Sequence, residues 1–358
     1  MGGKAAVEAL WDPGVMAGAE LGSRPMAPVA VRPPRDSTSA WPLLDRVGYW
    51  LCWATGVGLF ATAAAIVLYM LVKGVSFLRL SLFVTSPAPS LHQTQSGGFS
   101  DPIIGTLLVT AIGIVIAAPL GVALAAWVSE YGRPAWLSRT VESALEMVAG
   151  APSVVLAIFG LLIFSQGFLG FLSQHAASGG VLGQSFLNAG IVMSALALPL
   201  VFASTRESLS QVPARLREAS YALGKTRATT IRRVLLPAIR PGVAGGIVLG
   251  MGRIIGDTAI ITILLGATLK NEPVGGAPLV GTLRGTGSTL TSYVFNNSPA
   301  GEGNSHEKAY AAAFVLLMLV LALNALVTHL TGDRDARIWG GRTWRVLRGV
   351  GGRLRWIR

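Results

Sequence analysis

Charged residues, cysteine and histidine are all scarce in this chain. Only 13% of its 358 residues are charged, whereas ordinary globular domains carry about 25%. Its single cysteine, Cys52, excludes an intrachain disulfide and a cysteine-based metal site. The four histidines are scattered without ligand spacing, so we expect no metal site. With 52% hydrophobic residues, the composition predicts an integral membrane protein.

A complete nucleotide-binding loop is also missing. The stretch Ala219–Thr226 fits a loose form of the phosphate-binding P-loop pattern. The four residues between its alanine and its glycine are helix formers rather than a glycine-rich cradle, and no apolar strand precedes them. We therefore expect no ATPase site, no cofactor and no enzymatic activity in this chain.

Six apolar stretches reach the length of about 20 residues that a membrane-spanning helix needs. They are Tyr49–Val72, Pro102–Val128, Val141–Ser165, Phe186–Ser204, Pro241–Leu265 and Ala309–Leu330. Residues 1–46, rich in proline, glycine and arginine, are interpreted as a disordered tail without the apolar core of a signal peptide. The sequence thus predicts an all-α membrane domain of six helices over residues 47–330, followed by a basic tail at 331–358.

The distribution of lysine and arginine predicts the orientation. Of 29 such residues, 23 lie in the two tails and in the connections 129–139 and 205–240, and five lie in the other loops. Because cytoplasmic loops carry the Lys and Arg excess, we expect both termini and the 205–240 connection to lie in the cytoplasm, with the chain in the cell membrane. The net charge of +12 is explained by this rule and by contacts with anionic membrane lipids, and without a recognition motif we expect no nucleic-acid partner.

One remaining cation, Arg253, lies in the middle of the fifth span. Gly246, Gly250, Arg253 and Asp257 are four, three and four residues apart, which places them on one face of a continuous helix. A charge at the bilayer centre costs about 3 kcal/mol unless it is paired or faces water. Two interpretations stay open: a structural Arg253–Asp257 ion pair, or a substrate pathway in which the arginine binds a tetrahedral oxyanion. If Asp257 accepts a proton from the anion, phosphate is favoured over sulfate.

A second pair of charges, Glu142 and Glu146, lies near the cytoplasmic end of the third span. Glu142 is explained by extension of its side chain to the interface. Glu146 is expected either to pair with a basic residue of another helix or to belong to a gate on the pathway. Three prolines inside predicted spans are expected to kink or break them: Pro119, Pro152 and Pro199.

The connection 205–240 carries the most specific pattern. Glu218-Ala219-Ser220 is followed after three residues by Gly224, and after nine more by Val-Leu-Leu236-Pro237. We expect a helix that Gly224 ends and a second helix over Thr230–Leu236 that Pro237 ends. Composition alone fits any arginine-rich amphipathic connection. The spacing, however, resembles the coupling loop, or EAA loop, of ABC-importer permeases, where the membrane subunit docks onto its ATPase.

Further runs resemble the permease subunits of the phosphate-specific ABC importer. They are Ile104–Thr110, Ala118–Val122, Ser129–Tyr131, Glu146–Ser153 and Gly252–Thr258. Of the two paired permeases of that system, the chain is more similar to the A-type, through Gly97–Thr106 and Ala149–Ser153. The family usually has glutamate where this chain has Asp257.

The resemblance implies a type I importer fold and transport of inorganic phosphate. It also implies four partners: a second permease of the C-type, two ATPase subunits that bind the ATP, and an extracytoplasmic phosphate-binding protein. The implied ATPase-coupling residues are Glu218, Ala219, Gly224, Leu236 and Pro237. Arg253, Asp257 and Glu146 are the candidate pathway residues. The alternatives are a permease for another oxyanion or small solute, or an ATP-independent channel.

Overall fold

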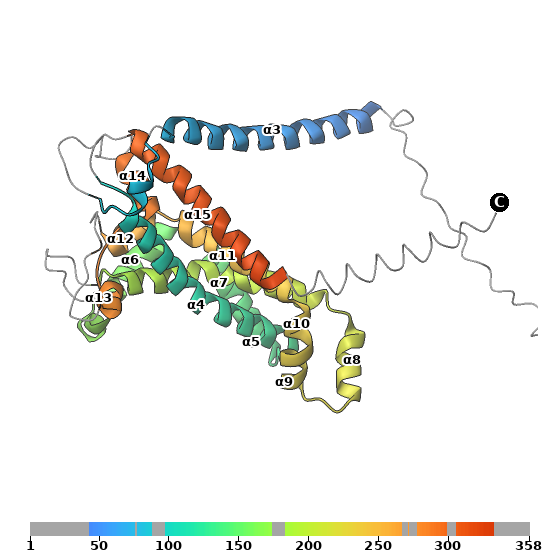
Figure 1. The fold of residues 1–358 in the computed structure, drawn as a ribbon. Coiled ribbons are helices and arrows are strands. Elements are labelled where there is room, and N and C mark those ends of the chain that lie inside the picture. The colour runs from blue at the N-terminus through green and yellow to red at the C-terminus, as the bar shows by residue number, and fades with distance from the viewer. Residues whose placement is uncertain are drawn as a thin grey trace, which may run out of the picture. The chain divides into compact units, whose positions relative to one another are not determined.

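The computed structural model describes residues 43–75, 77–87, 97–173, 183–266, 271, 278–298 and 306–332. Helices make up the regular structure of these residues (Figure 1), so the predicted all-α class is confirmed. The predicted tails lie outside the described residues, except that the first helix already begins at Leu43 and the last ends at Gly332. By its internal contacts the chain forms two units, residues 1–63 and residues 64–358.

Within the described residues, four helices are long and apolar enough to cross a membrane. They are α3 (Leu43–Gly74), α4 (Ser100–Glu130), α7 (Phe186–Ser210) and α15 (His306–Gly332). Two further helix pairs pass the same test but are sharply bent, which brings the number to six if each pair is one span. The four single helices coincide with the first, second, fourth and sixth predicted spans, and the pair Ala135–Gly150 and Ser153–Phe164 coincides with the third. The other pair, Arg227–Ala238 and Arg240–Gly256, joins part of the predicted 205–240 connection to the first part of the fifth predicted span.

The first unit contains α3 up to Ala63. Tyr49 makes edge-to-face contacts with Trp50 and Trp53, with ring centroids 6.0 and 6.5 Å apart. The hydroxyl of Thr55 donates to the carbonyl of Leu51, four residues earlier, so this polar side chain is satisfied within the helix. Aromatic rings at the end of an apolar helix are typical of the membrane interface.

Helix α7 is the centre of the second unit. In its most apolar window 67% of the residues are buried, against 28% for α4 and 17% for α15. It packs along both α4 and α11 (Arg240–Gly256), which lie beside it in Figure 1. Met193 and Leu196 of α7 join Val109 of α4 and Ile254 of α11 in one apolar cluster. The two outer helices are thus positioned by a shared central one.

The third predicted span is not one helix. Its two parts, α5 (Ala135–Gly150) and α6 (Ser153–Phe164), are bent by 106° relative to each other. Pro152 lacks an N–H and disfavours helical backbone at the preceding residue, and Ala151 accordingly has φ −69° and ψ 136°. The break expected at Pro152 is confirmed, whereas α4 and α7 continue through Pro119 and Pro199.

The fifth predicted span is broken as well. Helix α11 ends at Gly256, and α12 (Ala259–Leu265) begins after an extended residue, Asp257. Four short elements connect α7 to α11, and we call residues 214–238 the coupling segment. They are α8 (Ala214–Ala222), α9 (Arg227–Thr230), the π-helical η5 (Ile231–Leu235) and α10 (Leu236–Ala238).

Helical turns also occur between the spans. They are η3 (Leu80–Phe83), η4 (Gly167–Leu172), α13 (Pro278–Arg284) and α14 (Leu290–Asn297). Helix α14 packs on α15, where Leu290 and Tyr293 meet Ala311 and Val315 in a separate apolar cluster. Phe99 contacts Tyr293 edge to face, and burial raises the pKa of the Tyr293 phenol to about 12. The loops around the spans therefore contain ordered, buried structure.

Candidate functional site

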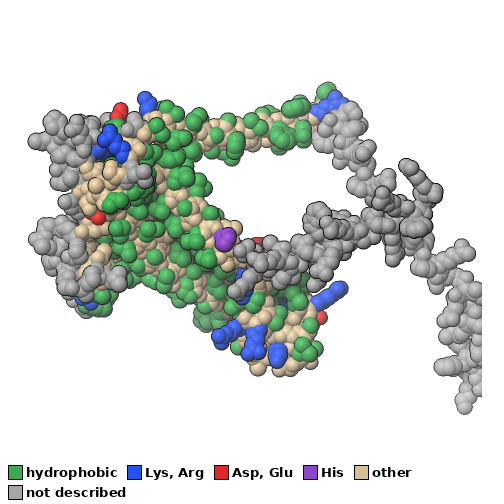
Figure 2. Space-filling view, in the orientation of Figure 1, with side chains coloured by type: hydrophobic (Ala, Val, Ile, Leu, Met, Phe, Trp, Pro, Cys, Tyr) green, Lys and Arg blue, Asp and Glu red, His purple; other side chains and the backbone are tan. Residues whose placement is uncertain are grey.

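The coupling segment forms a basic end of the second unit. Figure 2 shows Lys and Arg side chains gathered over α8, α9 and α10, whereas hydrophobic side chains cover the visible faces of α4 and α15. On α8, the side chains of Glu218 and Ala219 are exposed. They are available to a partner protein, as the sequence pattern predicts for residues that dock.

Gly224 ends the first helix of this segment in the predicted way. Its φ is +71°, a conformation that costs L-residues with a side chain but not glycine. The N–H of Gly224 donates to the carbonyl of Tyr221 at 2.9 Å, and that of Lys225 donates to Ser220 at 3.2 Å. These two bonds form a Schellman cap. A Cβ at Gly224 would meet no atom within 4 Å, so the requirement is conformational rather than steric.

The second helix of the segment differs from the prediction at both ends. It begins at Arg227 instead of Thr230, because the hydroxyl of Thr226 accepts a hydrogen bond from the N–H of Thr229 and caps the first turn. Pro237 does not end it, since α10 continues to Ala238. A 72° bend then separates this helix from α11.

The π-helical turn explains how the helix tolerates Pro237. A proline ring clashes with the carbonyl four residues earlier and removes one hydrogen bond. In η5 the N–H of Leu236 instead donates to the carbonyl of Ile231, five residues earlier. The wider turn shifts the backbone hydrogen-bond pattern of the helix immediately before the proline. Such π-helical turns are frequent at functional sites.

A buried hydroxyl pair holds the two helices of the coupling segment together. The side-chain oxygens of Ser220 and Thr230 are 2.8 Å apart, and both residues are buried. Leu235, fully buried, anchors the same segment in an apolar cluster with Leu209 of α7. This pairing gave no sequence signal, because two hydroxyls ten residues apart fit no motif.

Arg217 ties the coupling segment to the membrane helices. Its Nε donates to Glu130 Oε1 at 2.9 Å, and its two terminal nitrogens donate to the carbonyls of Val212 and Leu209. Arg227 also donates to the carbonyl of Glu130, at 3.3 Å. The end of α4 is therefore bonded to both α8 and α9. Sequence reasoning missed this anchor, although Glu130 lies in one of the runs that resembled the importer family.

Of the two acidic residues on α5, Glu142 is the one that forms an interhelical pair. Its Oε1 is 2.9 Å from a terminal nitrogen of Arg206 on α7. Glu146 is exposed and forms no ion pair among the described residues. The bend at Pro152 begins one turn beyond it, so Glu146 belongs to α5 rather than to a straight span.

Arg253 and Asp257 do not share a helix face, so the predicted shared face of a continuous helix is wrong. Asp257 lies beyond the end of α11 with φ −84° and ψ 124°, and its residue is only 5% exposed. Its Oδ1 accepts a hydrogen bond from the N–H of Ile260 at 3.0 Å, which caps α12. Arg253 is exposed on α11, and the structure contains no Arg253–Asp257 ion pair. The simple structural pairing is therefore wrong.

Gly246 and Gly250 of α11 do lie on one face, as predicted, and Gly242 lies on the same face. A Cβ on Gly246 would come within 3.1 Å of Val201 Cα, and one on Gly250 within 3.2 Å of Ala197 Cβ. Gly242 approaches α7 as well, and its carbonyl accepts a hydrogen bond from the Ser204 hydroxyl at 2.7 Å. Glycines spaced four apart allow another helix to approach closely, and here that helix is α7.

Comparison with known proteins agrees with this architecture. The family described as "Binding-protein-dependent transport system inner membrane component" matches residues 117–334. The probable ABC transporter permease protein YqgH of Bacillus subtilis is 32% identical over 81% of this chain and 92% of its own length. The phosphate transport system permease protein PstC of Mesorhizobium japonicum is 29% identical over 86% and 96%. PstA 1 of Mycobacterium tuberculosis is 30% identical over 65% and 70%.

Among solved structures, the crystal structure of a bacterial alginate ABC transporter in complex with a periplasmic protein contains a similar chain. The TM-score is 0.56 at 16% identity, over 80% of this chain and 94% of that one. This likeness shows the fold, and the expected type I importer permease fold is confirmed. Together with the family match, it places the chain in a known class: it belongs to the inner membrane components of binding-protein-dependent transport systems, the multi-pass permease subunits of ABC importers.

Proposed function

We propose that this chain is one of two paired permeases of an ATP-driven importer that carries inorganic phosphate across the cytoplasmic membrane. The observation that carries the proposal is the coupling segment. Its exposed Glu218 and Ala219 precede a glycine-capped turn, and Arg217 bonds the same helix to α4 and α7. Transmission of motion from a separate ATPase requires a docking surface that is attached to the membrane helices.

Two observations support phosphate as the cargo. Relatives named as phosphate transport permeases, PstC and PstA 1, are about 30% identical to this chain. Arg253 is exposed on α11 and has no carboxylate partner among the described residues, so its guanidinium can bind an oxyanion. Asp257, at the break that follows, is proposed to contribute to the same pathway. Glu146 is proposed as an element of the gate at the cytoplasmic end.

The orientation proposed from the Lys and Arg distribution places the coupling segment and both termini in the cytoplasm. There two ATPase subunits would bind ATP and dock at Glu218, Ala219, Gly224, Leu236 and Pro237. A phosphate-binding protein would deliver the anion from the outside, where α13 and α14 are proposed to lie. Closure of the ATPases would displace α8, and Arg217 would pass this displacement to α4 through Glu130.

The choice between the A-type and the C-type role belongs to the same proposal. The A-type assignment rests on the runs Gly97–Thr106 and Ala149–Ser153. The comparisons do not separate the two types, because PstC and PstA 1 relatives match at similar identity. Complementation of strains that lack one or the other permease distinguishes them: the A-type assignment requires rescue of the strain without the A-type permease.

Vesicle uptake tests the proposal. In proteoliposomes that contain the assembled importer, ATP-dependent uptake of labelled phosphate is expected, with unlabelled phosphate competing and sulfate or molybdate competing weakly. Glu218→Ala should reduce transport-coupled ATP hydrolysis tenfold or more. Glu207→Ala, which removes an exposed carboxylate near the end of α7, should leave it unchanged. Competition by sulfate or molybdate but not by phosphate would assign the permease to another oxyanion, and ATP-independent flux would favour a channel.

A further inference from the structure

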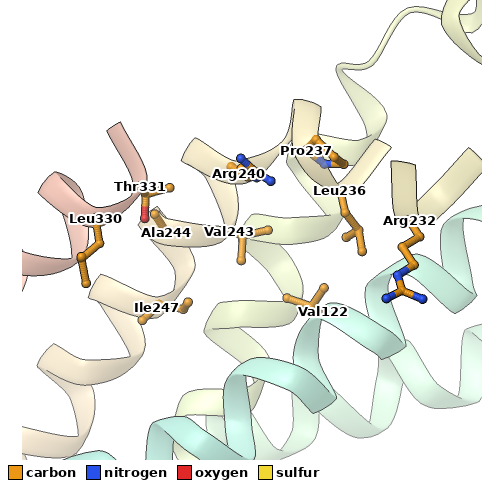
Figure 3. A pocket seen from close by; sticks show the side chains of 10 residues that line it. All are labelled: Val122, Arg232, Leu236, Pro237, Arg240, Val243, Ala244, Ile247, Leu330 and Thr331. Carbon is orange, nitrogen blue, oxygen red and sulfur yellow. The ribbon is translucent and has the colours of Figure 1, made fainter. Parts of the chain in front are cut away.

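A groove lies between the coupling segment, where Leu236 and Pro237 line it, and the helices α4, α11 and α15. It has a volume of about 550 Å³, within the range of about 300–1,000 Å³ that holds organic ligands. Figure 3 shows its lining: Val122 of α4 and Ile247 of α11 face the space from two sides, and Leu330 of α15 lies at its edge. Arg232 and Arg240 line it from the coupling segment and from the start of α11.

The two arginines make this groove unusual. Both are exposed, and among the described residues neither forms an ion pair with a carboxylate. Among the residues that the structure describes, no aspartate or glutamate lines the groove. Each guanidinium carries five hydrogen-bond donors in a planar fork that fits phosphate oxygens. The lining therefore combines a cationic rim with an apolar floor of valine, leucine and isoleucine side chains.

The position of the groove narrows the possible occupants. Arg240 begins α11 and Thr331 is the second-last residue of α15, so the groove lies where spans meet the membrane surface. A phosphodiester joined to an acyl chain fits both halves of the lining.

We propose that this groove binds one anionic phospholipid, with its phosphate between Arg232 and Arg240 and an acyl chain along Val122 and Ile247. Basic pockets between transmembrane helices at the cytoplasmic side are suited to such headgroups. A bound lipid of this kind bridges the coupling segment and α11 across the 72° bend between them. It thereby stabilises the bend.

Native mass spectrometry of the assembled importer, purified in detergent, tests this site. Phosphatidylglycerol and phosphatidylcholine of the same acyl chains are titrated, and phosphatidylglycerol is expected to bind more tightly. Arg232→Gln and Arg240→Gln should each weaken phosphatidylglycerol about fivefold, and the double variant twentyfold or more. The matched control is Arg233→Gln, which removes an exposed arginine of the same π-helical turn that does not line the groove. It should bind as the unaltered protein does.

Three outcomes would overturn the proposal. They are equal binding of the two lipids, equal loss in the Arg233→Gln control, and displacement of phosphatidylglycerol by inorganic phosphate, which would assign the arginines to the free anion. Each single variant is measured alone, so the test stands even if the double variant does not assemble. Phosphate uptake is not the readout, and failure of the lipid site is therefore distinguishable from failure of the transport proposal.

Discussion

Asp257 shows how one residue can hold two roles that a sequence does not separate. Its carboxylate is buried and caps α12 through the N–H of Ile260. A structural cap needs only a side-chain oxygen, whereas a role in the passage of a phosphate anion needs a charge or a proton acceptor. The two roles therefore respond differently to loss of the charge.

We predict that Asp257→Asn keeps the stability of the fold and reduces phosphate uptake tenfold or more. Asparagine caps helices about as well as aspartate, while Asp257→Ala should cost about 1 kcal/mol of stability through loss of the cap. Thermal unfolding and vesicle uptake of both variants measure this. If Asp257→Asn transports normally and only Asp257→Ala is impaired, the carboxylate is a cap and nothing more.

At this scale the sequence predicted residues whose role depends on their immediate neighbours. Gly224 was identified from the helix formers before it, and Gly246 and Gly250 from their spacing of four. The prediction that Arg253 and Asp257 share a helix face was wrong. A rotation of 100° per residue applies only to an unbroken helix, and α11 ends at Gly256. The Ser220–Thr230 pair depends on a tertiary contact, so no local pattern predicts it.

At the scale of elements, two ion pairs each join two helices, and they differ in burial. One of them, Arg217–Glu130, holds the coupling segment. The Arg217–Glu130 side chains are 23% and 7% exposed, whereas those of Arg206–Glu142 are 47% and 24% exposed. Both pairs have a shortest distance of 2.9 Å. Solvent screening should weaken the more exposed pair much more strongly.

We therefore predict that Arg217→Gln lowers the free energy of unfolding by about 1.5–3 kcal/mol, the range for hydrogen bonds to charged groups. Arg206→Gln, the matched control, should cost about 0.2–1 kcal/mol. Denaturant unfolding of the purified protein gives both values, and ATP hydrolysis in the assembled importer should fall only for Arg217→Gln. Equal effects of the two substitutions would contradict a special role for the α4 anchor.

The three prolines inside predicted spans show what local sequence leaves undecided. Pro152 follows Gly150, beside which a Cβ would meet no atom within 4 Å, and the chain bends there by 106°. Pro199 lies in the most buried helix, where neighbouring helices hold the backbone on both sides of it. Pro119 is exposed on α4 and does not break that helix either, so packing around the proline does not by itself decide the outcome. The same residue type therefore breaks one span and not the other two, which local sequence leaves undecided.

At the scale of the molecule, the orientation is the prediction that rests on the whole sequence. We expect Lys225 in the coupling segment and Glu307 at the start of α15 to lie on opposite sides of the membrane. In a Cys52→Ser background, Lys225→Cys should react with a membrane-impermeant maleimide only in inside-out vesicles, and Glu307→Cys only in right-side-out vesicles. Labelling of both cysteines in the same vesicles would refute the arrangement.

The fold class and the number of apolar stretches were predictable because each membrane span needs a long apolar segment, which can be recognised in the sequence. The pairing of helices was not, because apolar side chains carry no information about which neighbour they meet in a lipid environment. The glycines of α11 are the exception, since their spacing indicates a close contact even though it does not name α7 as the partner.

That contact has a consequence for how the importer moves. Gly242, Gly246 and Gly250 bring the backbone of α11 against α7, and the two helices are joined directly by the coupling segment. Sliding one helix along the other would drive the backbone of α11 into the side chains of Ser204 and Ser208. A displacement of α8 should therefore rotate α7 and α11 together as one rigid body, without sliding of one helix along the other.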